Sequence, residues 1–446
     1  MLFSGLASAK KQCFNDVSFN TLSYLSAIDV SDININDIDN SFLVNTEERF
    51  NLSFSESIHT ERHFWHLNKL QKLYLAQEIA RKIISDLDSL NISIVVSSGI
   101  ADFASYITHK ICPYYNIPFI YSITIRLGNY YCLSSTVDSA PIGFHKNLEL
   151  NKQLLKHNPH IFNNTVTFIE NYKINKTQPY YVNDKSSMFR YINWGDLNTI
   201  KKFFRNKLTD KNSYNNHLTI FQLFTNRLKR ITNKRFYDNI VIKDNISLED
   251  LNDKNYFIYP LHFHPESATL MLGRWFNDQV RIIEMISKAL PANYILIVKE
   301  HPVSIGRRTN HFYKEISYFH NVFFISDKYT SHEILSGSKG VITISSTMGF
   351  EAFLHKKPCI CIGDVFYNAS SNTYSTTDFK NFNETIKKAI NHIFDDDDLI
   401  AIFHTLLADS FLMEHFYPSD FSQKHVETFA QLLNNLLLGK INTNLP

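Results

Sequence analysis

Residues 255–363 alternate between short apolar runs and segments with helical periodicity, and this alternation restricts what the chain can fold into. The apolar runs predict strands at 256–261, 294–298, 322–325, 340–344 and 358–362, separated by helices at 277–290, 332–338 and 349–354. Strands that alternate with helices form parallel sheets, and ligands bind outside the carboxyl ends of such strands. We therefore expect a doubly wound α/β domain with its site at that edge.

Three polar clusters interrupt this pattern: 260–266 (PLHFHPE), 299–302 (KEHP) and 345–351 (SSTMGFE). The last two directly follow predicted strands. Because the carboxyl ends of parallel strands share one edge, the clusters can converge on one anionic, nucleotide-like ligand. An enzyme of activated sugars or phosphates is therefore the first hypothesis.

The second cluster places Lys299 and His301 two residues apart, directly after a strand that Pro302 prevents from continuing. In an extended segment both side chains lie on one side, where they offer two donors to phosphate oxygens. Arg307 and Arg308 follow in the next loop and add positive charge. We expect Lys299, His301, Pro302 and Arg307 to contact a nucleotide. A histidine that caps a loop is the alternative.

In the third cluster, Ser345, Ser346, Thr347 and Gly349 lie between a predicted strand and a predicted helix. Hydroxyls and backbone N–H groups at a helix N-terminus bind anions, although the same residues also serve as helix caps. Glu351, just inside the helix, is expected to accept a hydrogen bond from a ribose or sugar hydroxyl. A first-turn helix charge is its alternative.

The first cluster supplies the acid/base candidates. Glu266 is a candidate general base, and His264 would orient it or contact a phosphate. Asp102, one turn into a predicted helix of the first domain, is a second candidate carboxylate, with simple helix charge as its alternative. His262, His264 and Glu266 are not joined by a further imidazole or thiolate at a convincing spacing, so no metal site is expected.

Composition excludes several classes of protein. The formal net charge of +2 is too balanced for a protein that binds a nucleic-acid backbone. No apolar run approaches the roughly 20 residues of a transmembrane helix, and no signal-peptide pattern is recognisable. Five cysteines without CxxC spacing fit a reducing compartment. We expect a cytoplasmic protein, with peripheral inner-membrane contact as an open alternative.

A chain of 446 residues is too long for one ordinary core, so we expect two domains. The first is expected at 1–235, with a βαβ unit over 92–121 and a helical insertion at about 150–235 that is either solvated or meets an anionic lipid or glycan. The second is expected at 236–415, and a helix within 416–446 is expected to pack back on the first domain. The acidic run 395–398 is expected to form a solvated turn that caps the next helix.

The three clusters, in this order and spacing, resemble the bacterial capsule polysaccharide biosynthesis family, which includes the Kdo transferases that build the lipid-linked capsule linker. The resemblance covers 259–269, 298–302 and 344–352, and ends in Gly363 and Tyr367. It implies a GT-B architecture, in which two Rossmann-like domains face a central cleft and the C-terminal one binds the donor nucleotide. It also implies that catalysis takes place between the domains without an obligatory metal, and that the N-terminal domain lies on the acceptor side.

Bacterial sialyltransferases similarly use a His-Pro pair and a Ser/Thr-Ser pair around a CMP-activated donor. By that resemblance, His301, Ser345 and Ser346 would contact the nucleotide and its phosphate. The implied function is a glycosyltransferase of capsule or surface polysaccharide that uses a nucleotide-sugar donor, first CMP-Kdo or another CMP-ulosonate, and requires no cofactor. The implied partners are a glycan or lipid-linked glycan acceptor and capsule assembly proteins.

Three alternatives stay open at this point. A nucleotide-sugar epimerase and a polyol-phosphate transferase share the fold, and a non-catalytic capsule assembly or export subunit would keep a degenerate site.

Overall fold

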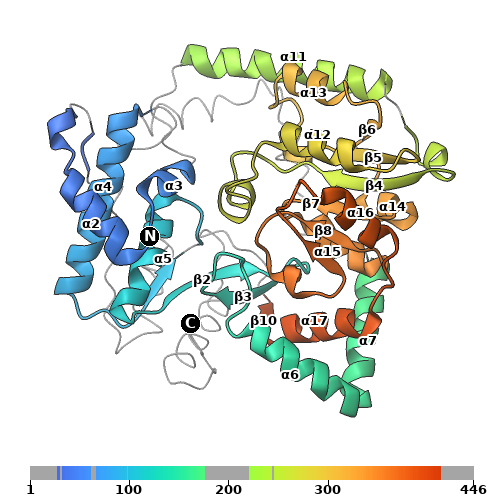
Figure 1. Cartoon of the computed structure of the whole chain (residues 1–446), viewed down its shortest axis with the longest axis horizontal. Coiled ribbons are helices and arrows are strands. Elements are labelled where there is room, and N and C mark those ends of the chain that lie inside the picture. The colour runs from blue at the N-terminus through green and yellow to red at the C-terminus, as the bar shows by residue number, and fades with distance from the viewer. Residues whose placement is uncertain are drawn as a thin grey trace. The chain divides into compact units, whose positions relative to one another are not determined.

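The computed structural model describes residues 28–30, 33–61, 67–97, 99–175, 220–243 and 246–412, and it divides into two compact units (Figure 1). Unit 1 takes in the chain up to residue 162 and from residue 401, and unit 2 takes in 163–176 and 181–400. Helix α11 (Ile220–Lys243) runs through residue 235, where the sequence predicts a domain boundary. The predicted boundaries stay predictions. Residues 176–219 of the predicted helical insertion and the predicted C-terminal helix lie outside the described residues.

Unit 2 is built on a six-stranded parallel sheet in the order β6-β5-β4-β7-β8-β9. The strands are β4 (Asn255–Pro260), β5 (Tyr294–Lys299), β6 (Val322–Ile325), β7 (Gly340–Thr343), β8 (Cys359–Cys361) and β9 (Thr373–Ser375). From β4 the chain winds outward to β6, returns past β4 to β7 and continues outward to β9. This is the order of doubly wound nucleotide-binding sheets, and its switch point lies between β4 and β7. The predicted doubly wound α/β sheet is confirmed.

Helices cover both faces of this sheet, as Figure 1 shows for α11, α12 and α13 beside β4 to β6. The helices are α12 (Gln279–Ala289), α13 (Asn310–Ile316), α14 (Ser331–Gly337), α15 (Thr347–Leu354) and α16 (Phe382–Ile390). Phe257 and Tyr259 of β4 join the core with α11, α12, α13 and α16. Tyr256 and Ile258 join the opposite core with α14 and α15. Because both faces are buried, the strands are near-continuous apolar runs, which made them predictable.

Three short helical turns lie in the loops that follow strands of this sheet. They are η4, a π-helical turn (Ala268–Leu272), and the 3-10 turns η5 (Pro302–Ser304) and η6 (Phe366–Ala369), while a further 3-10 turn, η3 (Glu249–Leu251), precedes β4.

A Cβ atom on Gly363 would lie 2.7 Å from the carbonyl oxygen of Leu272 and 2.8 Å from that of Ile344. A glycine therefore lets the chain after β8 pass between the turn after β4 and the end of β7.

Unit 1 holds a smaller, four-stranded sheet in the order β1-β2-β3-β10. The strands are β1 (Val95–Ser97), β2 (Phe119–Thr124), β3 (Tyr130–Ser134) and β10 (Ser410–Leu412). Helix α5 (Phe103–Ile111) joins β1 to β2 in parallel, which confirms the predicted βαβ unit. The β2–β3 and β3–β10 pairs are antiparallel, so only the first part of this sheet follows a Rossmann-like pattern.

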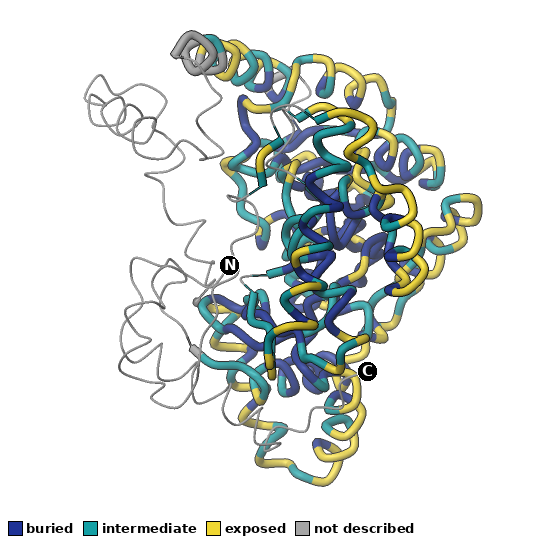
Figure 2. The backbone as a smooth tube through the Cα atoms, turned by 90° about the vertical axis from the view of Figure 1, so that its left-hand side faces the viewer, coloured by how far each residue is buried: buried dark blue, intermediate teal, exposed yellow. Residues whose placement is uncertain are grey.

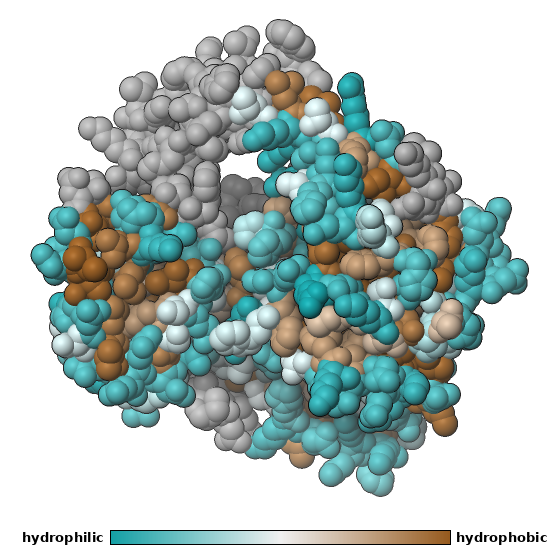
Figure 3. Space-filling view, turned by 45° about the horizontal axis from the view of Figure 1, so that its top comes forward, coloured by the Kyte–Doolittle hydropathy of each residue, from teal (hydrophilic) through white to brown (hydrophobic). Residues whose placement is uncertain are grey.

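Helices make up most of the remaining described chain. They are η1 (Ile35–Asp37), α2 (Asn40–Phe50), α3 (Phe54–His59), α4 (Lys69–Ser89), η2 (Cys112–Tyr115), α6 (Phe144–His157), α7 (Pro159–Asn175) and α17 (Asp396–Ala408). In Figure 2 the buried backbone is concentrated inside and the exposed backbone lies outside, and the face in Figure 3 mixes hydrophilic with hydrophobic side chains. Within the described ranges, no helix is both long enough and apolar enough to span a bilayer.

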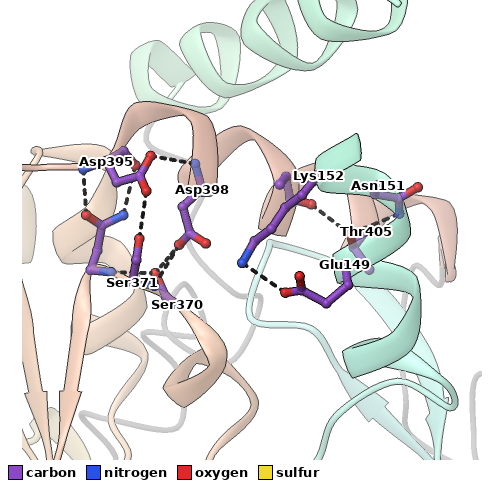
Figure 4. A network of polar contacts seen from close by, with 10 residues as sticks. Glu149, Asn151, Lys152, Ser370, Ser371, Asp395, Asp398 and Thr405 are labelled. Carbon is purple, nitrogen blue, oxygen red and sulfur yellow. Dashed lines mark hydrogen bonds and ion pairs between the residues drawn. The ribbon is translucent and has the colours of Figure 1, made fainter. Parts of the chain in front are cut away.

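The prediction for the acidic run is wrong for one of its four residues. Helix α17 does begin at Asp396, but Asp398 is only 3% exposed. Its Oδ2 accepts hydrogen bonds from Ser370 Oγ at 2.6 Å and from the backbone N–H of Ser371 at 3.0 Å (Figure 4). The loop before β9 supplies these donors, so Asp398 is a tertiary contact and not a solvated charge.

Candidate functional site

The three polar clusters follow β5, β4 and β7, which are neighbours in the sheet of unit 2. Pro260 and Lys299 pair at the ends of β4 and β5, and the backbone N–H of Leu261 donates to the carbonyl oxygen of Lys299 at 2.8 Å. The carboxyl ends of these strands flank the switch point, where doubly wound sheets bind their ligands. The topology therefore brings all three clusters to the expected edge.

His262 joins the first cluster to the third. The backbone N–H of Ser345 donates to His262 Nε2 at 3.2 Å, and Ser345 Oγ donates to the carbonyl oxygen of Ala268 at 3.2 Å. The side chain of Gln279 clamps the backbone of His262, accepting from its N–H at 2.7 Å and donating to its carbonyl oxygen at 3.0 Å. His262 and Ser345 are 5% and 1% exposed, so this connection is internal.

His301 caps η5 and lies beside the first cluster. The backbone N–H of Val303 donates to His301 Nδ1 at 3.3 Å, so the neutral ring carries its proton on Nε2. Burial, reinforced by the charges of Arg308 and Arg307, lowers the pKa of His301 to about 4. The ring is therefore neutral at pH 7 and offers an N–H donor without a charge. Its capping role fits the loop-capping alternative and is compatible with ligand contact through Nε2.

Phe263 connects His301 to Arg307. The centroids of the Phe263 and His301 rings lie 6.4 Å apart, and the Arg307 guanidinium carbon lies 5.1 Å from the Phe263 centroid. Arg307 is exposed and His301 is partly exposed, with Pro302 partly exposed beside it. An uncharged donor and an exposed cation thus share one aromatic neighbour, which suits recognition of an anion.

Three predicted ligand contacts lie inside the protein. The Lys299 side chain is buried, and its Nζ donates to the carbonyl oxygen of Tyr329 at 2.7 Å. Desolvation lowers the pKa of Lys299, against the opposing charges of Asp327, Glu333 and Glu351. Ser345 uses both its N–H and its hydroxyl within the fold, and Gly349 is buried. These residues therefore stabilise the sheet edge from the protein interior.

Ser346 and Thr347 are partly exposed at the start of α15. Ser346 Oγ accepts from the backbone N–H of Met348 at 3.1 Å, so the capping alternative is confirmed for this residue. The hydroxyl of Tyr367 donates to the Ser346 carbonyl oxygen at 2.9 Å and fixes the start of the helix. Capping and anion binding are compatible, and anion binding stays a prediction.

Glu351 is partly buried in α15, close to Lys299 and Ser331. Desolvation raises the pKa of its carboxyl to about 7, although a hydrogen bond from Ser331 and the charge of Lys299 oppose the rise. The carboxyl therefore changes its charge near neutral pH. Its predicted contact with a sugar hydroxyl stays a prediction.

His264 and Glu266 are connected through Thr269. His264 Nδ1 lies 2.9 Å from Thr269 Oγ1, and that hydroxyl lies 3.0 Å from the carbonyl oxygen of Glu266, to which it donates. His264 is exposed, and partial desolvation together with Arg308 lowers its pKa. Glu266 is partly exposed and lies two residues before η4. The acid/base roles of these two residues stay predictions.

Asp102 belongs to unit 1, where it caps α5. Its Oδ1 accepts from the backbone N–H of Ser105 at 2.8 Å, so Asp102 is the N-cap residue before α5 and does not lie one turn into the helix as predicted. The three clusters belong to unit 2, and the catalytic role of Asp102 stays a prediction.

Glu300, which lies between two predicted ligand contacts, has a role that the sequence does not predict. Its side chain is fully buried and accepts from Arg308 Nε at 2.8 Å, Tyr313 Oη at 2.8 Å and the backbone N–H of His301 at 2.7 Å. No local signal marks this role, because its partners come from the loop and helix that follow. Among the described residues, no group of three or more His, Cys, Asp or Glu side chains could hold a metal ion.

In a comparison with known proteins, residues 195–417 match the family model described as "Capsule polysaccharide biosynthesis protein". The chain is 26% identical over 130 residues to the capsule polysaccharide export protein KpsS of Escherichia coli, which covers 27% of this chain and 33% of KpsS. It is 29% identical over 161 residues to Protein FixF of Sinorhizobium fredii, which covers 35% of this chain and 37% of FixF. The chain thus matches about a third of the length of each of these curated relatives.

Two solved structures are similar over most of the chain. The KpsC β-Kdo 2,7 transferase of Thermosulfurimonas dismutans shares 12% identity with a TM-score of 0.41, over 80% of this chain and 89% of that one. The UDP-GlcNAc 2-epimerase of Methanocaldococcus jannaschii, in complex with UDP-GlcNAc and UDP, shares 10% identity with a TM-score of 0.29, over 81% of each chain. These TM-scores are low, so we assign the fold from the strand order of the chain's own sheets and not from these two structures.

Proposed function

This chain belongs to the capsule polysaccharide biosynthesis protein family, and we propose that it transfers a sugar from a nucleotide-activated donor to a surface polysaccharide or its lipid-linked precursor. The donor we propose first is CMP-Kdo or another CMP-ulosonate. We further propose a GT-B arrangement, with the donor nucleotide bound by unit 2.

One observation supports this proposal above the others: polar clusters from three neighbouring strands meet at the switch point of a doubly wound sheet. The hydrogen bond from Ser345 to His262 Nε2 joins the turns after β7 and β4 across that point. A sheet edge at a switch point is where such folds bind nucleotides.

At that edge, the exposed and partly exposed residues would have different roles. His301 Nε2–H, Arg307 and the helix N-terminus at Ser346 and Thr347 would surround the phosphate of the donor. Uncharged donors and one cation stabilise the negative charge that develops on the leaving nucleotide. Glu351 would accept a hydrogen bond from a ribose or sugar hydroxyl.

The transfer itself requires a proton acceptor. The acceptor hydroxyl oxygen would bond to the anomeric carbon while the bond from that carbon to the phosphate oxygen breaks. Glu266, or alternatively Asp102, would take the hydroxyl proton, and the nucleotide would leave with the bonding electrons. His264 would orient Glu266 through Thr269, which contacts both residues.

The experiment that tests the site is a thermal-shift panel of CMP, UDP and GDP on the wild type, Arg307→Ala and Lys288→Ala. Lys288 is a matched control, because its side chain is 68% exposed and it pairs with Glu284 on α12. A nucleotide at 100 times its dissociation constant stabilises the protein by about 2.7 kcal/mol. We expect a CMP-specific shift that Arg307→Ala weakens and Lys288→Ala retains. A wild type that responds to none of the three would refute the donor site.

A second experiment separates transfer from the other activities of the fold. Purified protein is incubated with CMP- and UDP-sugars, first without and then with a capsule-derived acceptor. Release of nucleotide that depends on the acceptor supports transfer, whereas a change of the sugar without an acceptor indicates an epimerase. Binding without turnover in either arm would favour an assembly or export subunit.

A further inference from the structure

Two consecutive arginines follow η5, and their side chains lie in different environments. Arg307 is exposed beside Phe263, whereas the Arg308 side chain is 11% exposed. Arg308 Nε donates to Glu300 Oε2 at 2.8 Å, and Arg308 Nη2 donates to the carbonyl oxygen of His262. Its guanidinium carbon also lies 4.5 Å from the centroid of the Phe312 ring. Arg308 therefore uses its donors in hydrogen bonds within the protein, one to Glu300 and one to His262.

Glu300 is the other end of this connection. Its side chain has no exposed surface, and it accepts from Tyr313 Oη and the backbone N–H of His301 besides Arg308. A buried carboxylate is tolerated when charge-assisted hydrogen bonds surround it, and this one has three. The carboxylate and the guanidinium neutralise each other, so the pair adds no net charge to the sheet edge.

The pair is part of a continuous chain of contacts across the site. Glu300 directly follows β5 and accepts a hydrogen bond from the backbone N–H of His301. Arg308 donates both to Glu300 and to the backbone carbonyl oxygen of His262, after β4. His262 Nε2 then accepts from the backbone N–H of Ser345, after β7. The contacts thus connect the carboxyl ends of β5, β4 and β7. They lie closer to the protein interior than the residues that would contact a nucleotide.

We propose that Glu300 and Arg308 are positioning residues of the nucleotide site, which set His301 and the 345–347 turn relative to each other, while Arg307 alone of the two arginines acts on the ligand by its charge. The inference rests on the proposed function. Its physical basis is geometric: only a guanidinium reaches both the Glu300 carboxylate and the His262 carbonyl oxygen, because its donors are arranged as a rigid fork. A lysine would supply the same charge and only one of these contacts.

The test compares charge-conserving variants at the two positions. The nucleotide dissociation constants of Arg308→Lys and Arg307→Lys are measured by calorimetry with CMP, UDP and GDP. We expect Arg308→Lys to weaken binding tenfold or more, and Arg307→Lys to weaken it less than threefold. Equal losses at the two positions, or a retained affinity in Arg308→Lys, would overturn the inference.

The salt dependence of binding gives a readout that a general loss of structure does not move. Arg307→Ala removes a cation that acts on the anion, so the dependence of affinity on salt concentration should become shallower. Arg308→Met combined with Glu300→Gln removes both charges of the pair, whose sum is zero, so the slope should stay that of the wild type. If the slope decreases in this double variant, the pair acts on the ligand by its charge and the inference is wrong.

Two further measurements keep the inference testable when a variant is unstable or when no nucleotide binds. Tyr313→Phe removes only one of the three hydrogen bonds of Glu300, and we expect a two- to fivefold loss of affinity with an unchanged salt slope. Amide hydrogen exchange in segments 261–266 and 344–347 reports positioning without any ligand. Faster exchange there in Arg308→Lys, with β8 unchanged, supports positioning even if the wild type fails the nucleotide panel. Unchanged exchange in both segments refutes it.

Discussion

The backbone N–H of Ser345 donates a hydrogen bond to Nε2 of His262, and this contact spans the point where the sheet of unit 2 reverses its winding. Both residues are buried, so the bond is shielded from solvent. The bond has a consequence for the rest of the edge: the turn that begins α15 and the loop that carries His264 and Glu266 are held as one structure. A ligand that touches either therefore meets a preorganised site.

Substitution of His262 should show how much this bond contributes to stability. His262→Ala leaves the Ser345 N–H without its acceptor and opens a cavity, so we expect a loss of about 2–4 kcal/mol. His262→Gln offers an oxygen at a similar reach and should lose about 1 kcal/mol or less. Urea unfolding measures both variants. His311→Ala, at a side chain 79% exposed, is the control and should lie within about 0.5 kcal/mol of the wild type. Equal losses in the Ala and Gln variants would show that the acceptor is unimportant.

Gly349 tests the packing under the helix N-terminus. A Cβ atom there would lie 2.8 Å from Tyr367 Oη and 3.0 Å from both Cys359 Sγ and Thr343 Cγ2. Alanine usually stabilises a helix by about 1 kcal/mol relative to glycine, but here we expect Gly349→Ala to destabilise by about 1–3 kcal/mol. Tyr367→Phe removes the nearest atom, so the double variant should be more stable than additivity predicts. Strict additivity in the thermodynamic cycle would contradict this contact.

The pKa of His301 predicts a pH dependence of stability. Its folded pKa of about 4 lies below the ordinary value of 6.5, so the unfolded chain binds more protons between these values. Stability is therefore retained above pH 6.5 and is lost as the pH falls towards 4, by about 2 kcal/mol between pH 6.5 and 5. His301→Gln cannot titrate, and the difference between its unfolding free energy and that of the wild type should change by this amount. A difference that is constant with pH would show that His301 titrates normally.

The sequence predicted the sheet of unit 2 well because its strands are buried on both faces. The predicted strand 322–325 coincides with β6, and β5 and β7 each differ from their predictions by one residue. Prediction was poorer in unit 1, where β3 pairs with β10 at Tyr131 and Phe411. Such a pairing joins segments far apart in the sequence, and no local pattern encodes it.

For the site, the sequence predicted which segments meet but not which side chains face outward. Convergence follows from topology, since the carboxyl ends of parallel strands share an edge. The burial of Lys299 and Ser345 depends on Tyr329 and His262, which are contributed by other loops. The role of Glu300 depends likewise on Arg308 and Tyr313. These contacts exist only in the folded chain, so residue type and spacing do not reveal them.

The acidic run at the start of α17 offers a matched pair for measuring a buried carboxylate. Asp398 is buried and contacts Ser370 and Ser371 (Figure 4). Its neighbour Asp397 is exposed. Asp398→Ala leaves the Ser370 hydroxyl and the Ser371 N–H without their acceptor, so we expect a loss of about 2–4 kcal/mol.

Asp397→Ala removes the same charge from the same helix turn and should cost less than about 1 kcal/mol, because only its interaction with the helix dipole is lost. Urea unfolding followed by far-ultraviolet circular dichroism compares the two variants at constant ionic strength. A third variant, Asp398→Asn, keeps one oxygen as acceptor and should fall between them. If Asp397→Ala and Asp398→Ala are equally destabilised, the run acts through its total charge, and the tertiary contact with the loop before β9 contributes nothing measurable.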